Sequence, residues 1–149
     1  MRISEIKIER KVELHQTDLG GLMHHHNYFV WMEQAEYELF DLIGEPVVGD
    51  LDENLKGSGW PRAEVSMKYL KPLKFRDEVV IHLKITRIRA AALEYAADFI
   101  HNGDVVAKGK YKTISCLYDA TQREPPQIVP ASESFLNKIE VYNEDLPAG

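Results

Sequence analysis

The feature that most constrains this fold is one stretch of helical periodicity set among segments that alternate like strands. Apolar residues recur at alternating steps of four and three: Tyr28, Met32, Ala35, Leu39, Leu42. This spacing builds one face of a helix, because 3.6 residues complete a turn. Acidic residues take polar positions between them: Glu33, Glu36, Glu38, Asp41. The pattern predicts an amphipathic helix over residues 28–43, with Asn27 as its N-cap and Gly44 at its end.

The segments around this helix alternate polar and apolar residues, as half-buried strands do. Strands are predicted for five segments: 5–14, 63–69, 79–85, 93–99 and 104–118. Asn102-Gly103 predicts a type I′ turn that joins the last two strands. One strand, one helix and four strands with short connections predict an α+β fold with an antiparallel sheet. Because one helix covers only part of such a sheet, a homo-oligomer is expected.

The segments between and after these elements lack a period. Turn-forming residues dominate 45–59, which is predicted to be an exposed loop, and three prolines predict an irregular segment over 119–131. Ser132 is placed to cap a short helix that reaches Ile139. Residues 143–149 are expected to fray at the chain end.

Length and charge narrow the classes of function. The chain has 149 residues, and 24 acidic against 18 basic residues give a net charge of −6. We interpret it as one domain over 1–149, with its core in 4–118 and a C-terminal extension over 119–149. The acidic balance argues against nucleic-acid binding, and no apolar run reaches the ~20 residues that span a bilayer. A single cysteine and a charged N-terminus favour a cytoplasmic protein.

Polar residues concentrate between the first strand and the helix, from His15 to Tyr28. Asp18 is the one carboxylate there, and Gly20-Gly21 permits a tight turn that a ligand can approach closely. The run then opens the helix, where free N–H groups favour developing negative charge. A carboxylate beside an oxyanion-binding helix start suits attack on an acyl carbon.

Each part of this segment also has a simpler interpretation. Asp18 before two glycines is suited to capping a turn, and the adjacent histidines can form an exposed polar run: His24, His25, His26. A metal site from His15, Asp18 and one of these histidines is a further alternative. No HxxxH or HExxH spacing supports it, so neither a metal nor another cofactor is predicted.

Three further groups of polar residues lie in the predicted strands. Cys116 has no nearby base in its strand and is predicted to be a buried thiol rather than a nucleophile. The lysines of the last strand share one parity and predict a solvated face: Lys108, Lys110, Lys112. Arg87 and Arg89 end a strand, and they are a weak signal for phosphate binding.

Two motifs in the chain resemble those of a known family. The first is the run Gln16-Thr17-Asp18-Leu19-Gly20-Gly21-Leu22-Met23-His24-His25-His26-Asn27-Tyr28, followed by Trp31, Glu33 and Ala35. The second is Tyr69-Leu70-Lys71-Pro72-Leu73 with Asp77. The first is similar to the pattern D-T-D-x-x-G-x-V-x-H-x-x-Y of acyl-CoA thioesterases in the 4-hydroxybenzoyl-CoA thioesterase-like hotdog family. The second resembles that family's strand–Pro–strand connection, and together the likeness covers about residues 4–118.

The resemblance implies a hotdog fold, in which an antiparallel sheet of five to six strands wraps around one long helix. It also implies a homodimer or homotetramer whose sheets join edge to edge, with the site at the interface. By position, Asp18 matches the catalytic aspartate, and His25 matches the motif histidine whose backbone N–H polarises the thioester carbonyl. Gly21 and Tyr28 are expected to contact the substrate, and Arg89 matches a residue that contacts CoA phosphates. The chain departs from the family pattern at four places: Gln16, His24, His26 and Ala90-Ala91-Ala92.

The function favoured by these residues is hydrolysis of an acyl-CoA thioester to a free acid and CoA. Asp18 would act as nucleophile or as general base on a water, and the His25 N–H would hold the oxyanion. The aromatic helix start and the 45–59 loop are expected to shape an apolar acyl pocket. A hotdog dehydratase of hydroxyacyl thioesters and a non-enzymatic acyl-CoA-binding module are the alternatives.

Overall fold

The structure is a computed structural model that describes residues 1–145. Residues 146–149, the end of the segment expected to fray, lie outside the described residues. The elements are, in chain order, β1 (Glu5–Lys11), η1 (Leu14–Gln16), α1 (His26–Ile43), β2 (Lys56–Gly59), β3 (Arg62–Tyr69), β4 (Glu78–Ile88), β5 (Ala92–His101), β6 (Asp104–Ile114), β7 (Cys116–Asp119), β8 (Gln127–Ile128) and α2 (Glu133–Leu136). Across residues 1–145, no helix combines the length and the apolar composition that a membrane crossing requires.

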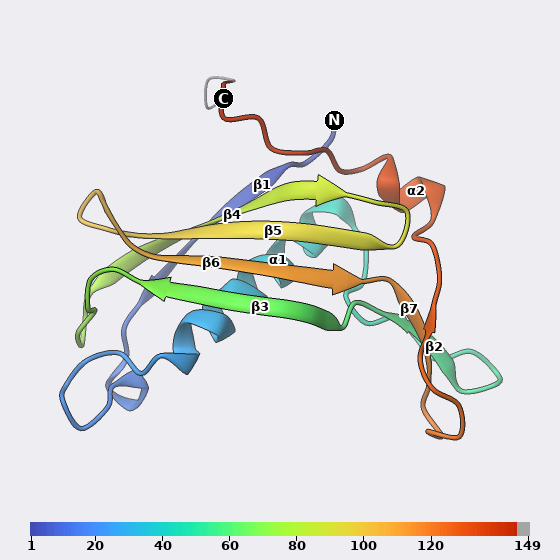
Figure 1. Cartoon of the computed structure of the whole chain (residues 1–149), viewed down its shortest axis with the longest axis horizontal. Helices are drawn as coiled ribbons and strands as arrows, with labels where there is room; N and C mark the ends of the chain where they lie inside the picture. Colours follow the sequence, from blue (N-terminus) through green and yellow to red (C-terminus); the bar gives the residue numbers. More distant parts are fainter. Residues whose placement is uncertain (146–149) are drawn as a thin grey trace.

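One antiparallel sheet and one long helix dominate the fold (Figure 1). The five strands lie in the order β1-β4-β5-β6-β3, and every neighbouring pair is antiparallel. Helix α1 lies behind this sheet in Figure 1 and packs against one of its faces. The predicted α+β architecture, an antiparallel sheet around one long helix, is confirmed.

Helix α1 forms where the periodicity predicted a helix, although it begins at His26 rather than at residue 28. The prediction of Asn27 as N-cap is wrong, because His25 occupies that position. The Asn27 side chain is buried and donates to two loop carbonyls instead. Gly44 ends the helix in the left-handed conformation, at φ 69°, which a residue without a Cβ adopts without strain.

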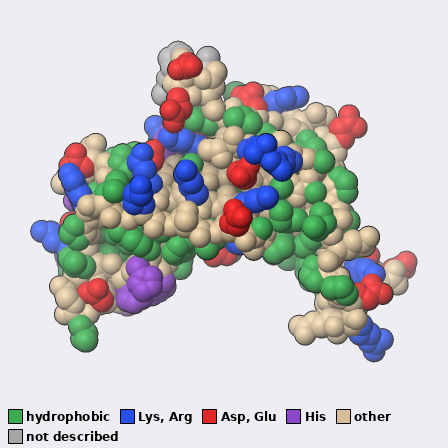
Figure 2. Space-filling model, viewed as in Figure 1, with side chains coloured by type: hydrophobic (Ala, Val, Ile, Leu, Met, Phe, Trp, Pro, Cys, Tyr) green, Lys and Arg blue, Asp and Glu red, His purple; other side chains and the backbone are tan. Residues whose placement is uncertain are grey.

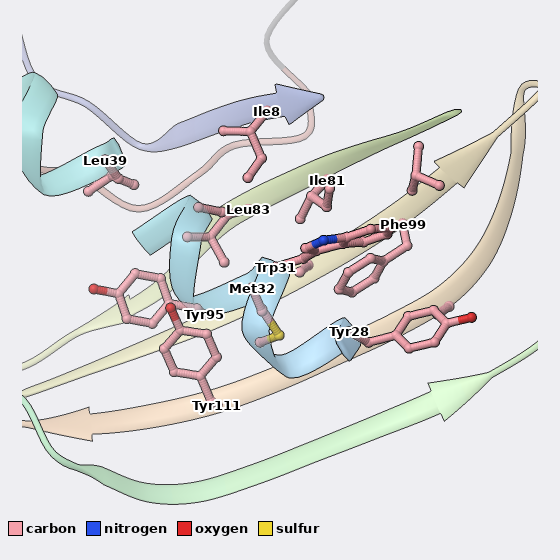
Figure 3. Close-up of a cluster of buried hydrophobic side chains, with 14 of the residues drawn as sticks. Ile8, Tyr28, Trp31, Met32, Leu39, Ile81, Leu83, Tyr95, Phe99 and Tyr111 are labelled. Atoms are coloured by element: carbon pink, nitrogen blue, oxygen red, sulfur yellow. The ribbon is translucent and has the colours of Figure 1, made fainter. Parts of the chain in front are cut away.

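The core fills the space between α1 and the inner face of the sheet. Figure 3 shows Trp31 and Met32 of the helix among strand side chains such as Phe99, Ile81 and Tyr95. Each of these five side chains exposes 2% of its surface or less. Burying one large apolar side chain contributes about 1.5–3 kcal/mol. These contacts therefore hold the first half of α1 at a defined place on the sheet, which in turn places the chain segment that precedes the helix.

Several strand boundaries differ from the predicted ones. Strand β1 ends at Lys11, and Leu14, predicted to face inward, lies in η1 with 68% of its surface exposed. The segment 104–118 divides into β6 and β7, and β7 joins a second sheet with the order β2-β7-β8. Strands β2 and β8 therefore lie in the segments predicted to be a loop, 45–59, and irregular, 119–131. Strand β2 depends on pairing with β7, which is distant in sequence, whereas β8 pairs with the same strand across the segment that precedes it. Local composition reports neither pairing.

Other local predictions are confirmed. Asn102 and Gly103 both take positive φ, 49° and 80°, in the turn between β5 and β6. Ser132 caps α2 by accepting a backbone N–H at 3.0 Å, although this helix ends at Leu136. Cys116 is buried, and burial raises the pKa of its thiol. The three lysines of β6 lie on the outer face of the sheet, where Figure 2 shows basic and acidic side chains over the strands.

Strand β3 forms one edge of the five-stranded sheet and stays open to solvent. All but one of its residues are exposed, and Val65 and Tyr69 expose 54% and 45% of their surface. The opposite edge is partly covered, because Ile3 next to β1 forms a parallel bridge with Ile139. A strand therefore forms where the alternation over 63–69 predicted one, but most of its residues are not buried within a single chain. Proteins rarely leave such an edge without a cover or a partner.

A buried ion pair ties this edge strand to the helix. Glu36 lies in the middle of α1 with 0% of its side chain exposed, so it does not belong to the solvated face. Its carboxylate accepts hydrogen bonds from the Arg62 guanidinium at 2.9 Å and from the Tyr111 hydroxyl at 3.1 Å. Burial raises the pKa of the Glu36 carboxyl, and the charge of Arg62 opposes that shift. Because Arg62 is the first residue of β3, the pair fixes the start of this strand against α1.

Candidate active site

The candidate site lies where the chain enters α1. A shallow cavity of about 370 Å³ opens there. Three segments line it: the loop before α1, the first turn of α1, and the end of β3 with the connection that follows. The lining residues are Asp18, Leu22, Met23, His25, Tyr28, Tyr69, Leu70, Lys71 and Pro72. Figure 2 shows histidine side chains exposed beside hydrophobic ones at this end of the molecule. The structure therefore brings three of the predicted site residues together, Asp18, His25 and Tyr28. Gly21, the other predicted residue of this loop, is not among the residues that line the cavity.

The Asp18 carboxylate is held by the turn that follows it. Its Oδ1 accepts hydrogen bonds from the backbone N–H groups of Gly20 at 2.8 Å and Leu22 at 3.2 Å. Gly21 takes φ 80°, a conformation that favours glycine, and a Cβ on Gly20 would lie 3.2 Å from Oδ1. Within residues 1–145, no hydrogen bond uses Oδ2. Asp18 thus caps its turn with one oxygen and leaves the other available at the cavity.

Backbone hydrogen bonds fasten this loop on two sides. The Met23 N–H donates to the Leu73 carbonyl at 2.7 Å, which ties the loop to the connection after β3. The His24 N–H donates to the Gln16 carbonyl at 2.8 Å, which ties the helix start to η1. Since Leu73 is fully buried, the loop is anchored to the core and not only to the surface.

The start of α1 leaves a backbone donor in a residue that lines the cavity. His25 precedes the first helical residue, and the hydrogen bonds of residues 1–145 include none from its N–H. Its carbonyl accepts the Tyr69 hydroxyl at 3.0 Å. N–H groups at a helix start lack intrahelical acceptors, and the helix dipole adds positive potential there. This end of the cavity is therefore suited to negative charge.

Tyr28 forms an apolar wall of the site. Only 3% of its surface is exposed, and its ring lies edge-on to those of Tyr69 and Phe99, with centroids 5.0 and 5.4 Å away. Burial, with a smaller contribution from Tyr69, raises the pKa of Tyr28 to about 12. The phenol therefore stays protonated near neutral pH and is unsuited to act as a base.

The neighbouring histidines form a cluster of their own. His24 and His26 are hydrogen-bonded through their Nδ1 atoms, and the His25 ring lies 4.2 Å from the His24 ring. His15, which the metal alternative required, lies 3.4 Å from the Glu13 carboxylate. In the part of the chain that the structure describes, no group of three or more His, Cys, Asp or Glu side chains is arranged to hold a metal ion.

Two predicted parts of the site lie elsewhere in the chain. Arg89 is exposed in the hairpin between β4 and β5 and does not line the cavity. The 45–59 loop follows the C-terminal end of α1, so within one chain it does not shape this cavity. Conversely, sequence reasoning assigned no site role to Tyr69 or Lys71. Both belong to the Tyr69–Leu73 motif, and this motif is the sequence feature that could have indicated a role in the site.

The profile of the thioesterase-like superfamily matches residues 12–139. The chain belongs to the thioesterase-like superfamily. The predicted enzyme class, a thioester hydrolase, is confirmed at the level of this family.

Relatives of this thioesterase-like chain carry similar names. A 1,4-dihydroxy-2-naphthoyl-CoA hydrolase of Parasynechococcus marenigrum is 25% identical over 124 residues, which cover 79% of this chain and 81% of that protein. A 1,4-dihydroxy-2-naphthoyl-CoA thioesterase from Synechocystis superposes with a TM-score of 0.74 at 16% identity, covering 91% of this chain and 95% of the other. A 4-hydroxybenzoyl-CoA thioesterase variant complexed with 4-hydroxybenzoyl-CoA gives 0.75 at 13% identity, covering 93% and 100%. The structural likenesses establish the shared hotdog fold.

Proposed function

We propose that this thioesterase-like protein hydrolyses an acyl-CoA thioester to a carboxylic acid and CoA. The observation that carries the proposal is that Asp18 and His25, the residue at the start of α1, line one cavity. A nucleophile or base and an oxyanion donor are the two groups that acyl transfer needs. The names of the relatives support CoA thioesters as the substrate class.

The chemistry follows from the positions of these groups. Asp18 Oδ2 either attacks the thioester carbon directly or removes a proton from a water that attacks it. The carbonyl oxygen becomes an oxyanion, which the His25 N–H and the start of α1 stabilise. Collapse of the tetrahedral intermediate breaks the C–S bond, and the CoA sulfur leaves and takes up a proton. On the general-base route the acid forms at this step. On the direct route the product is an anhydride with Asp18, and water then hydrolyses it, which releases the acid and restores the Asp18 carboxylate. Loss of one oxyanion donor costs about 2.7–4 kcal/mol of transition-state stabilisation in comparable sites.

Release of a free thiol from acyl-CoA is the expected result when the purified protein is incubated with a panel of aliphatic and hydroxyaryl CoA thioesters. A thiol reagent follows the reaction, and mass spectrometry identifies the product. An enoyl-CoA product from a hydroxyacyl thioester would instead indicate a dehydratase. Binding of acyl-CoA without turnover would indicate a non-enzymatic binding module, and either result overturns the proposal.

The open edge of the sheet supports assembly of two copies through β3. Pairing of two β3 edges around a two-fold axis would make one continuous antiparallel sheet. Arg62 of one copy would then lie beside the Tyr69 end of the other, next to the Asp18 cavity. Arg62 of β3 pairs with Thr113 of β6, and Thr113 pairs in turn with Leu93 near the start of β5. The hairpin that contains Arg89 leads into β5, so it lies at the same end of the sheet as Arg62. The proposed partner-supplied contact with CoA phosphates is therefore Arg89.

A sedimentation experiment tests this assembly. At micromolar concentration the wild type is expected to have at least twice the 17.1 kDa mass of the chain. Val65→Arg places a charge on the β3 edge and is expected to weaken association by at least about tenfold, because desolvating an unpaired charge at an interface costs more than 1.4 kcal/mol. Ile128→Arg, at an exposed position on β8, is the matched control. A monomeric wild type would contradict the interface.

A further inference from the structure

Asn27 occupies an unusual position for a residue in the first turn of a helix. Its side chain exposes only 6% of its surface. The Nδ2 group donates to the Gln16 carbonyl at 2.8 Å and to the His24 carbonyl at 3.2 Å. Both neighbours are acceptors, so only the NH₂ side of the amide satisfies them. The Asn27 backbone N–H donates to the same His24 carbonyl at 3.1 Å.

The His24 carbonyl belongs to the peptide group that carries the His25 N–H. Two hydrogen bonds from Asn27 therefore restrain the plane of the peptide that carries this donor. The Gln16 carbonyl lies two residues before Asp18, so the Asn27 amide also joins the chain segment of the carboxylate to the oxyanion peptide. Together with the His24 N–H, which donates to the same Gln16 carbonyl, this bridge restrains the relative placement of Asp18 and His25.

Tyr69 holds the next peptide group. Its hydroxyl donates to the His25 carbonyl at 3.0 Å, across 44 residues of sequence. Its ring packs edge-on against Tyr28, which is itself part of the core. Burial raises the pKa of Tyr69, so the hydroxyl remains a donor near neutral pH. The His24 and His25 carbonyls thus accept hydrogen bonds from two side chains of different elements, Asn27 of α1 and Tyr69 of β3.

We infer that Asn27 and Tyr69 are positioning residues, which hold the His25 N–H in the orientation that stabilises the oxyanion. The inference rests on the proposed thioester hydrolysis and adds to it a requirement for these two side chains. Neither touches the reacting atoms, so both act through the His24–His25–His26 backbone. Misplacement of an oxyanion donor weakens transition-state binding far more than ground-state binding. Their loss is therefore expected in kcat and not in KM.

Tyr69→Phe and Asn27→Ala test the inference with steady-state kinetics. Tyr69→Phe keeps the ring packing and removes one hydrogen bond, and kcat is expected to fall about 10-fold. Asn27→Ala removes two, and kcat is expected to fall about 100-fold. KM should stay within about twofold, because substrate binding does not depend on the orientation of the oxyanion donor. If Asn27→Ala fails to fold, Tyr69→Phe decides the question.

Matched controls separate positioning from general destabilisation. Tyr37→Phe removes the hydroxyl that donates to Glu33 on the solvent side of α1. Ile139→Ala opens a cavity at a fully buried position near α2. Both controls are expected to keep kcat within about twofold at a temperature where every variant is folded, since neither residue contacts the site. Parallel losses of kcat in the variants and the controls would overturn the inference.

Backbone relaxation of ¹⁵N-labelled protein provides a readout that does not need turnover. The order parameter of the His25 N–H is expected to be about 0.85 in the wild type and to fall toward about 0.6 in Asn27→Ala. If the wild type hydrolyses no acyl-CoA, the proposed function fails, but this measurement still tests whether Asn27 and Tyr69 hold the His25 peptide. An unchanged order parameter in both variants would refute the positioning role.

Discussion

Replacing Asp18 with asparagine is expected to lower kcat for thioester hydrolysis by at least about 100-fold, within or beyond the range for loss of a general base. The amide keeps an oxygen that can accept the Gly20 and Leu22 N–H groups, so the turn survives. It is a poor nucleophile and a poor proton acceptor, so either proposed role of Asp18 disappears. Single-turnover thiol release measures the effect, and circular dichroism and acyl-CoA binding show whether fold and affinity persist.

The chain contains a matched control for this substitution. Asp52 Oδ1 accepts the N–H groups of Asn54 at 2.8 Å and Lys56 at 2.9 Å, the same two- and four-residue pattern that Asp18 makes. Asp52→Asn should therefore change the turn chemistry in the same way while leaving kcat within about twofold, since Asp52 lies outside the cavity. Asp18→Asn that retains more than about a tenth of wild-type kcat would reduce Asp18 to the same turn-capping role.

Removing the guanidinium from the buried ion pair is expected to produce the largest loss of stability. Arg62→Ala leaves the Glu36 carboxylate in the core with only the Tyr111 hydroxyl as a partner. Breaking a buried pair from one side typically lowers the free energy of unfolding by about 3–5 kcal/mol. Because Arg62 is partly exposed, the lower end of that range is expected. Urea unfolding at fixed protein concentration measures the change, since assembly also contributes to stability.

The loss in Arg62→Ala should depend on pH. Burial already raises the pKa of Glu36 from its ordinary value of 4.5, and removing Arg62 deletes the charge that opposes this shift. An acid whose pKa is higher in the folded state stabilises the fold below its unfolded pKa, and that stability is lost as pH rises through the folded pKa. The variant should therefore lose less stability at pH 5 than at pH 8.

Arg87→Ala is the control for the ion-pair substitution. Arg87 lies 3.7 Å from Glu94 with 59% of its side chain exposed, and such surface pairs contribute about 0–1 kcal/mol. Its removal should cost little at either pH. If Arg62→Ala costs no more than Arg87→Ala, or the same amount at pH 5 and pH 8, Glu36 is not held by a buried charge pair.

The sequence by itself predicted the elements whose cause is local. Helical spacing from Tyr28, the left-handed end at Gly44 and the Asn102-Gly103 turn each depend on residues a few positions apart. Dihedral preferences and one-sided burial act over that distance, so the pattern carries them directly. The motif from Gln16 to Tyr28 likewise named Asp18 and His25, because loop and helix start adjoin in the chain. Their roles remain predictions that the proposed variants test.

The pairing of strands depends on residues that are far apart in the sequence. Whether 45–59 ends in β2 depends on β7, about 60 residues later, and no local pattern records that pairing. Strand β3 alternates like a half-buried strand, yet Val65 and Tyr69 stay exposed and Met67 is only partly buried, because the strand lies at the sheet edge. Edge position is a property of the whole sheet and not of the strand.

The tertiary structure alone decided the polar contacts that α1 makes with the rest of the chain. Glu36 occupies a polar position in the helical pattern, but Arg62 and Tyr111 reach it from two strands and allow its burial. Asparagine is a residue type that often caps helices, yet the Asn27 amide is buried and donates to the Gln16 carbonyl instead. Tyr69 meets His25 only because β3 ends beside the start of α1. A polar side chain takes whichever partner the folded chain brings within about 3 Å, and that choice is made by packing between distant segments rather than by the residues on either side.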